Sequence, residues 1–226
     1  MNSLVVVAHP DDEVLGAGAT INKLVNQGNR VAVAIMSGHA AARANISATL
    51  SEDEAKAMSI MGVEKVYHAD FPNIKMNTVP HLDLVQFIEK SITDWQADAI
   101  LTHHPSDVNI DHQETSKAAV AACRLFQRIE GVPKLRLFAY MEIPSSTEWS
   151  LNVAENRFQP NYFIEIGRIG IEKKIEALGA YAGVMRQYPH PRSVEAITGL
   201  AAARGAQAGC DYAEAFECVF RAERGI

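Results

Sequence analysis

A short run of β-branched apolar residues near the start of the chain ends abruptly in one histidine, one proline and three acidic residues. The stretch reads Val5-Val6-Val7-Ala8-His9-Pro10-Asp11-Asp12-Glu13, and a helical pattern of apolar residues follows it. Apolar runs of this length are typical of a central strand in a parallel sheet. Open α/β sheets bind their ligands just beyond the carboxyl ends of such strands. Because three consecutive carboxylates there would repel one another, we expect a cation to lie among them.

Strand and helix patterns alternate along the rest of the chain. Strands are predicted over residues 3–8, 30–36, 65–68, 98–103, 135–142, 162–166 and 216–220, and helices over 13–27, 51–62, 80–95, 112–128, 167–186 and 193–207. The alternation predicts an α/β fold with a mostly parallel sheet and helices on both of its faces. No internal repeat or linker interrupts the pattern, so we expect residues 1–226 to form one domain.

The bulk composition narrows the class of protein. Hydrophobic residues make up 48% and charged residues 21% of the sequence, as in ordinary globular domains. The formal net charge of −6 provides no basic surface for nucleic acid or anionic membranes.

The first residues carry no secretory signal pattern, and no apolar stretch approaches the roughly 20 residues that cross a bilayer. The three cysteines lack CxxC spacing and are expected to be reduced thiols, which predicts a cytoplasmic protein.

A second stretch of acidic residues and histidine follows the strand predicted over residues 98–103. It reads Asp107-Val108-Asn109-Ile110-Asp111-His112 and opens the next predicted helix. Because both stretches follow strand ends, we expect them to meet at one edge of the sheet. His9, Asp12 and His112 would then bind a metal ion and leave a fourth position for water, as in catalytic zinc sites. Zinc lowers the pKa of such a water to about 7, and Asp11 is the candidate general base, so the pattern predicts hydrolysis of an amide or ester.

These stretches resemble the motifs of a known enzyme family. Residues 8–13, Ala-His-Pro-Asp-Asp-Glu, are similar to the first motif of the LmbE-like (PIG-L) zinc-dependent deacetylases. Asp111-His112 is similar to the end of the family's second motif, which usually reads His-Pro-Asp-His. Arg204-Gly205 and residues 212–216, Tyr-Ala-Glu-Ala-Phe, resemble the family's closing pattern. The resemblance therefore extends over essentially the whole chain.

The resemblance carries expectations for fold, activity and site. It implies a Rossmann-like three-layer α/β/α fold whose metal site lies at the C-terminal ends of the strands. It also implies removal of acetyl groups from N-acetylglucosamine moieties of sugar conjugates. By the same resemblance, His9, Asp12 and His112 are the ligands of Zn²⁺, and Asp11 is the general base that acts on the zinc-bound water.

The chain departs from the family pattern in the second motif. The family's first histidine of that motif is thought to help stabilise the oxyanion, with the following aspartate as its partner. Asn109 and Asp111 occupy these two positions here, and both are candidate catalytic residues. An asparagine amide can donate a hydrogen bond, but it carries no positive charge and cannot shuttle a proton.

A second departure concerns a positive charge. The family often has an arginine just before a Glu-Ala-Lys sequence, whereas residues 51–56 here read Ser-Glu-Asp-Glu-Ala-Lys. Arg43, in a loop predicted over residues 37–48, is a candidate substrate-binding residue that would supply the charge. The alternative is Arg192 together with His190, both candidate catalytic residues in a late proline-rich loop.

Other patterns have simpler interpretations. Residues 16–21, Gly-Ala-Gly-Ala-Thr-Ile, superficially resemble a dinucleotide-binding GxGxxG motif. The pattern begins inside a predicted helix and has Ile21 at the third glycine position, so close packing of small residues against the sheet explains it better. We expect His103 to be a strand-end residue and Asp107 to serve a turn.

The sequence thus predicts a zinc hydrolase that removes an acetyl group from an N-acetylated amino sugar conjugate of the N-acetylglucosamine type. The substrate is a small molecule, and since family members often self-associate, a homo-oligomer is expected. Two alternatives stay open: a zinc amidohydrolase that acts on a non-sugar acyl amide, and a non-catalytic metal-containing binding protein, which Asn109 suggests. The sugar's carrier, the group that stabilises the oxyanion and the native metal are also open, because His/Asp/His sites accept several metals.

Overall fold

Seven strands form one sheet in the computed structural model, which describes residues 1–37, 50–151 and 156–223. The strands are β1 Asn2–Val7, β2 Arg30–Ile35, β3 Lys65–His68, β4 Ala99–His103, β5 Leu137–Met141, β6 Tyr162–Glu165 and β7 Ala213–Arg221. Their order in the sheet is β3-β2-β1-β4-β5-β7-β6. Strands β1 to β5 pair in parallel, and β7 pairs antiparallel with both β5 and β6. The mostly parallel sheet predicted from the sequence is confirmed.

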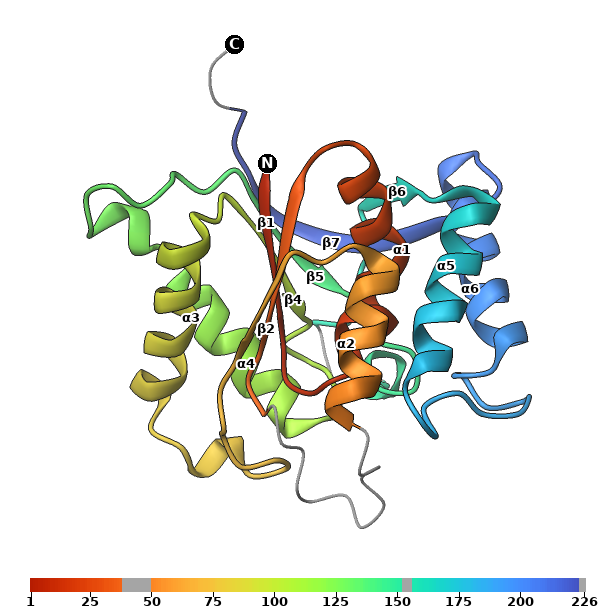
Figure 1. Cartoon of the computed structure of the whole chain (residues 1–226), viewed down its shortest axis with the longest axis horizontal. Helices are drawn as coiled ribbons and strands as arrows, with labels where there is room; N and C mark the ends of the chain where they lie inside the picture. The colour runs from red at the N-terminus through yellow and green to blue at the C-terminus, as the bar shows by residue number, and fades with distance from the viewer. Residues whose placement is uncertain (38–49, 152–155, 224–226) are drawn as a thin grey trace.

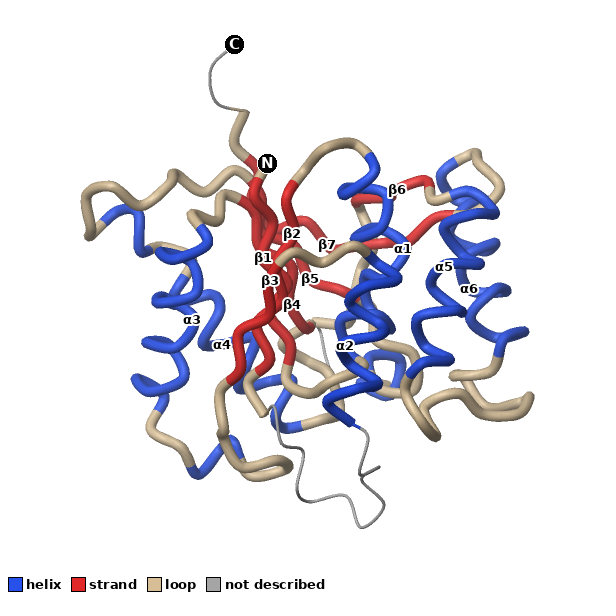
Figure 2. The backbone as a smooth tube through the Cα atoms, viewed as in Figure 1, coloured by secondary structure: helices blue, strands red, loops and turns tan. Residues whose placement is uncertain are grey.

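Six α-helices of the described ranges cover the two faces of the sheet. They are α1 Asp12–Asn26, α2 Leu50–Met61, α3 His81–Trp95, α4 Ile110–Ala122, α5 Gly167–Ala180 and α6 Val194–Ala208. Figure 2 shows α3 and α4 on one face and α1, α2, α5 and α6 on the other, which confirms the three-layer architecture. A separate buried apolar cluster fills each interface between sheet and helices. No helix within the described ranges combines the length and the apolar character needed to cross a membrane.

Strand β1 lies in the middle of the sheet, as its sequence predicts. Val5, Val6 and Val7 are completely buried between the two helical layers. The chain pairs β2 and then β3 on one side of β1, and returns to pair β4 on the other side. The segments that follow β1 and β4 therefore leave the sheet at a topological switch point, where open α/β sheets form their ligand crevice (Figure 1).

Several predicted boundaries were wrong. Helix α4 ends at Ala122 rather than at residue 128, because the chain tightens into a 3₁₀ turn at Leu125–Gln127 that buries Leu125. Helix α5 ends at Ala180 rather than at residue 186, because Tyr181 adopts an extended conformation with φ −78° and ψ 112°. The loop expected to hold Arg43 lies outside the described residues.

The glycine-rich stretch of α1 packs closely against the sheet. A Cβ atom added at Gly16 would lie 2.7 Å from Ile143 Cδ1 and 3.0 Å from Met141 Cβ, at the end of β5. These distances leave no room for a larger side chain, so the structure confirms packing as the role of this stretch.

Candidate metal centre

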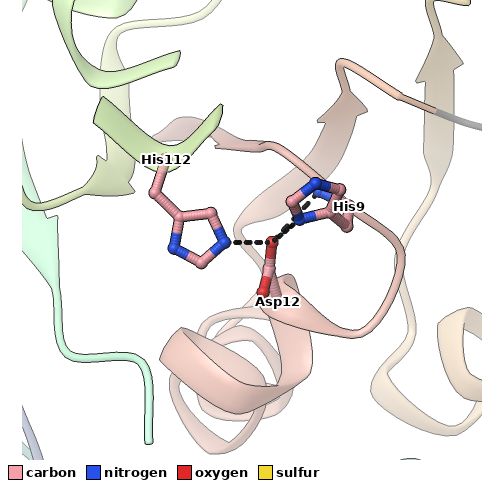
Figure 3. A group of neighbouring side chains, drawn as sticks. All are labelled: His9, Asp12 and His112. Atoms are coloured by element: carbon pink, nitrogen blue, oxygen red, sulfur yellow. Dashed lines mark hydrogen bonds and ion pairs between the residues drawn. The ribbon is translucent and has the colours of Figure 1, made fainter. Parts of the chain in front are cut away.

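Three side chains from the two strand ends converge beside the sheet. His9 follows β1, Asp12 is the first residue of α1, and His112 lies in the first turn of α4. Asp12 Oδ2 lies 3.3 Å from His9 Nδ1 and 3.2 Å from His112 Nε2 (Figure 3). One ligand atom of each residue lies within 4.8 Å of the others, and all three side chains are buried. The structure thus brings together the three residues predicted to bind the metal.

The donor set fits a divalent transition metal. Two imidazole nitrogens and one carboxylate oxygen are the ligands of many catalytic zinc and iron sites. His9 Nδ1 is buried and makes no well-directed hydrogen bond within the described residues, so its lone pair is available at the point that Asp12 and His112 also face. Side chains from three protein positions leave coordination positions open to solvent or substrate.

In each imidazole, the ring nitrogen that does not face Asp12 contacts a second carboxylate. Asp111 Oδ2 lies 2.9 Å from His9 Nε2, and Asp107 Oδ1 lies 3.1 Å from His112 Nδ1. Such partners fix the tautomer and the ring orientation of a ligating histidine. The sequence predicted Asp111 as a partner of the oxyanion-stabilising group, whereas the structure places it on His9.

The two carboxylates are themselves held by several donors. Asp111 accepts backbone N–H groups from Ile74 and Met76, the latter at 3.0 Å. Asp107 accepts the hydroxyl groups of Ser146 and Thr147, the latter at 2.8 Å. Both carboxylates are therefore rigid, and they fix the imidazoles in turn.

The electrostatics of the cluster favour a positive charge between the imidazoles. Burial alone would raise the pKa of Asp12, but His112 and His9 hold this pKa well below its usual value. Burial opposes protonation of His112, yet Asp12 and Asp107 outweigh it and raise its pKa to about 10. The pKa of His9 is also raised against its burial, by the Asp111 carboxylate on Nε2 and by the nearby Asp12 carboxylate. A site for a cation needs this balance of charge.

Asp11 sits beside the cluster in a strained backbone conformation. Its φ of 100° lies in the left-handed region, where a residue with a Cβ is held only if its surroundings over-determine it. The restraint includes the Glu13 carboxylate, which accepts the Asp11 N–H at 3.1 Å and the Tyr181 hydroxyl at 2.7 Å. Burial raises the pKa of Glu13 well above its usual value. Arg192 donates to Asp11 Oδ2 at 3.3 Å.

A pocket of about 400 Å³ opens beside the metal cluster. Its lining residues are Asp12, Ile74, Val108, Asn109, Ile110, His112, Ser145, Ser146 and Arg192. Two of the predicted catalytic residues, Asn109 and Arg192, thus line the same pocket as the predicted ligands Asp12 and His112. His190 does not belong to this lining: it is exposed, and its Nδ1 accepts the Arg192 N–H at 3.0 Å.

Asn109 also has a structural role. Its Oδ1 accepts the Asp111 N–H at 2.9 Å and caps the N-terminus of α4. The cap fixes the orientation of the amide, and within the described residues the amide nitrogen makes no hydrogen bond. The nitrogen remains a donor for a molecule in the pocket.

Two residues of the site were missed from the sequence. Asp107, expected to serve a turn, does accept the Asn109 N–H at 2.9 Å, but it also holds His112. His103, expected to be a strand-end residue with lining of the pocket as the less favoured alternative, is completely buried and stacks on His112 with ring centroids 3.8 Å apart. Its Nε2 accepts the Ala8 N–H at 2.8 Å, and burial lowers its pKa to about 3, so it stays neutral. Asp107 could have been found from the sequence, because it lies shortly before the predicted ligand His112. No local pattern indicates the contact of His103 with His112.

Comparison with known proteins identifies the family. A profile described as "PIG-L: GlcNAc-PI de-N-acetylase" matches residues 4–123, which is more than half of the chain. The chain therefore belongs to the PIG-L family of de-N-acetylases, which are hydrolases of carbon–nitrogen bonds in amides.

Individual relatives agree with this membership. The "Uncharacterized deacetylase YaiS" of Escherichia coli (strain K12) is 28% identical over 134 residues, which cover 57% of this chain and 71% of that protein. The N,N'-diacetylchitobiose deacetylase of Pyrococcus horikoshii has a similar structure, with a TM-score of 0.76 at 19% identity over 96% of this chain and 84% of that chain. The 4-carboxy-2-hydroxymuconate hydratase GalB of Pseudomonas putida KT2440 has a TM-score of 0.79 at 23% identity over 100% of both chains. At these identities the two structural likenesses show the fold alone.

Proposed function

We propose that the protein is a zinc-dependent hydrolase that removes the acetyl group from an N-acetylated amino sugar conjugate of the N-acetylglucosamine type. The observation that carries the proposal is the cluster of His9, Asp12 and His112, of which Asp12 and His112 line a pocket. Asp11 is bonded to Arg192, which lines the same pocket. Membership of a family of de-N-acetylases supports the reaction. The three cysteines are all free thiols, which supports a cytoplasmic location.

His9 Nδ1, an Asp12 carboxylate oxygen and His112 Nε2 would hold the ion. When bound, zinc supplies a Lewis acid that polarises the acetamide carbonyl and lowers the pKa of water to about 7. Asp107 and Asp111 keep the two imidazoles oriented for this task.

Asp11 is the proposed general base. It takes a proton from the attacking water and becomes a carboxylic acid. It then donates this proton to the nitrogen of the leaving amine. Its strained backbone and its two fixed neighbours, Glu13 and Arg192, hold the carboxylate at the edge of the cluster. A single group for both proton transfers suits a chain that has Asn109 in place of the family's histidine.

Two side chains of the pocket are the proposed donors to the oxyanion. The Asn109 amide nitrogen remains available after the amide oxygen has capped α4. The Arg192 guanidinium is positioned by Ser145, whose Oγ accepts from Arg192 Nε at 2.8 Å. Preorganised donors of this kind stabilise developing negative charge in sites that exclude water. His190 would act indirectly, through its hydrogen bond to the Arg192 backbone. If His190→Ala keeps full activity, His190 has no part in the mechanism.

The test is release of a primary amine from N-acetylglucosamine and from its phenyl glycoside by the zinc-loaded protein. Because a protein of the same fold is described as a hydratase, the assay follows the amine and not the loss of substrate. Asp11→Asn should lower kcat by about 10²–10⁴-fold, the range for loss of a general base, while it retains the metal. Loss of the metal together with activity would instead make Asp11 a ligand.

The assay also separates the two alternative functions. Amine release from acetanilide but from neither sugar would favour an amidohydrolase of non-sugar amides. Bound zinc without amine release from any of the three would favour a metal-containing binding protein. In that case, a gain of activity in Asn109→His would identify the missing histidine as the cause.

A further inference from the structure

One residue of the pocket wall has a backbone conformation that its side chain disfavours. Ile74 has a φ of 59°, in the left-handed region, where β-branched residues are genuine outliers. The backbone is fixed there because the N–H groups of Ile74 and Met76 both donate to Asp111, which holds His9. The conformation thus serves the metal site, and glycine or asparagine would adopt it with less strain.

The Ile74 side chain does not compensate for this strain by packing. It is 56% exposed, although it belongs to one of the most apolar residue types. It lines the pocket that also contains Asp12 and His112. A strained residue whose side chain is left in solvent at a functional site indicates a role in the site rather than in the core.

A second exposed apolar residue lines the same pocket. Val108 is 57% exposed and lies in the segment between β4 and α4. Ile110, at the start of α4, adds a third aliphatic side chain to the lining. Beside the polar donors Asn109 and Arg192, these residues form an apolar surface that the described part of the chain leaves uncovered. Binding sites combine apolar walls with a few orienting polar groups in this way.

We propose that Ile74 and Val108 form an apolar wall that binds an apolar group, aryl or alkyl, next to the substrate's N-acetyl group. This proposal rests on the deacetylase function proposed above and narrows its substrate class: conjugates with an apolar aglycone bind better than the free sugar. The gain comes from apolar surface removed from water on both partners.

The test measures binding, so that it does not depend on turnover. The probes are phenyl N-acetyl-β-D-glucosaminide and free N-acetylglucosamine, titrated calorimetrically into zinc-loaded Asp11→Asn protein. We expect the phenyl glycoside to bind at least tenfold more tightly. Ile74→Gly and Val108→Ser, each added to this background, should reduce the preference about four- to fifteenfold, the effect of one to two buried methylene groups.

The controls separate a wall from a structural role. Gln96 has a φ of 55° at the C-terminus of α3 and is exposed. Its carbonyl accepts from Asn2 at the start of β1, the end opposite to His9. Gln96→Gly should leave the preference unchanged, and the Tm of Ile74→Gly should be equal to or above that of its parent because strain is relieved. Zinc content is measured for each variant. If Ile74→Gly disturbs Asp111 and loses zinc, the effect of Val108→Ser on the preference for the phenyl glycoside decides whether the wall exists.

The outcomes distinguish this proposal from the one on which it rests. The apolar wall is overturned if Ile74→Gly and Val108→Ser both leave the preference for the phenyl glycoside unchanged. It is also overturned if neither probe binds. A lowered Tm with an unchanged preference overturns it too, because Ile74 would then serve stability. Wall-dependent binding in the Asp11→Asn background, together with no amine release by the zinc-loaded wild-type protein, would uphold the wall and reject the deacetylase function.

Discussion

At the scale of single residues, the candidate metal site depends on two carboxylates outside the predicted ligand set. Asp107 and Asp111 lie on the far nitrogens of His112 and His9, and each is held by at least two further donors. An imidazole without such a partner can rotate or change tautomer, and it loses basicity. The residues that hold the ligands are therefore as informative for this protein as the ligands.

Removal of one such carboxylate tests this point. Asp107→Asn should weaken zinc affinity about 10–100-fold, because the amide cannot stabilise the imidazole as a carboxylate does. Competition with a chromophoric chelator measures the affinity. Glu114→Gln is a matched control in α4, the helix that carries His112, since among the described residues Glu114 forms its ion pair with the exposed Lys117. Equal affinity of Asp107→Asn and the control would show that Asp107 serves only the turn.

The raised pKa of His112 predicts a dependence of metal binding on pH. With a pKa of about 10, His112 is protonated at neutral pH in the metal-free protein and must lose this proton to become a ligand. Zinc binding at pH 7 should therefore release at least one proton, and the affinity should rise with pH, by about tenfold per pH unit for one proton. Calorimetry in buffers of different ionisation enthalpy counts the protons. A count of zero would contradict the assigned protonation state.

The sequence was sufficient to predict that His9, Asp12 and His112 lie together, but not what surrounds them. His9, Asp12 and His112 stand at two strand ends in residue types that bind metals, so strand periodicity and chemistry locate them. The contact of His103 with His112 and of Asp111 with the backbone at Ile74 depends on how separate segments pack. No local pattern contains that information.

At the scale of elements, helix α1 is bent next to the site. Ala17 has φ −144° and ψ 15°, which are not helical values, so the helix is interrupted there. Lys174 of α5 donates to the freed Leu15 carbonyl at 2.8 Å and to Glu214 at 2.6 Å. Glu214 of β7 accepts the N–H groups of Ala19 and Thr20 at 3.2 and 2.7 Å. A buried ion pair thus satisfies both sides of the bend, as buried backbone groups require.

Breaking this pair should be costly. Lys174→Met leaves the Glu214 charge and the Leu15 carbonyl buried without their partner, and should lower the free energy of unfolding by about 3–5 kcal/mol. Urea denaturation measures the change. Addition of Glu214→Gln should recover part of the loss, because the uncompensated charge is removed. Lys173→Met is the control, since Lys173 is 42% exposed and pairs on the surface. A loss below 1 kcal/mol in Lys174→Met would show that the pair does not support the bend.

Element types were easier to predict than element ends. The β-branched strands and the periodic helices are set by local pattern, so their order follows from the sequence. The end of α5 depends on Tyr181, which leaves the helix and donates to the distant Glu13. The extended start of β7 depends on its antiparallel pairing with β6, where Ala213 pairs with Glu165. Such long-range contacts outweigh local preference.

At the scale of the whole molecule, the site joins two halves of the sheet. The segments after β1 and β4 separate at the switch point of the strand order. His9 and Asp111, which are 102 residues apart in the sequence, are in contact there. A metal ion held by ligands from both segments would link them in the folded state alone. Such binding stabilises the native protein by mass action.

The most direct measurement is metal content by elemental analysis of the purified, dialysed protein and of His112→Ala. Our account predicts one zinc per chain in the wild type and loss of the metal in His112→Ala. Asp12→Asn, which is isosteric, should also lose the metal, and circular dichroism confirms that each variant is folded. A wild-type protein without metal after zinc loading, or a folded His112→Ala protein that retains one zinc per chain, would contradict the assignment of this cluster as a metal centre.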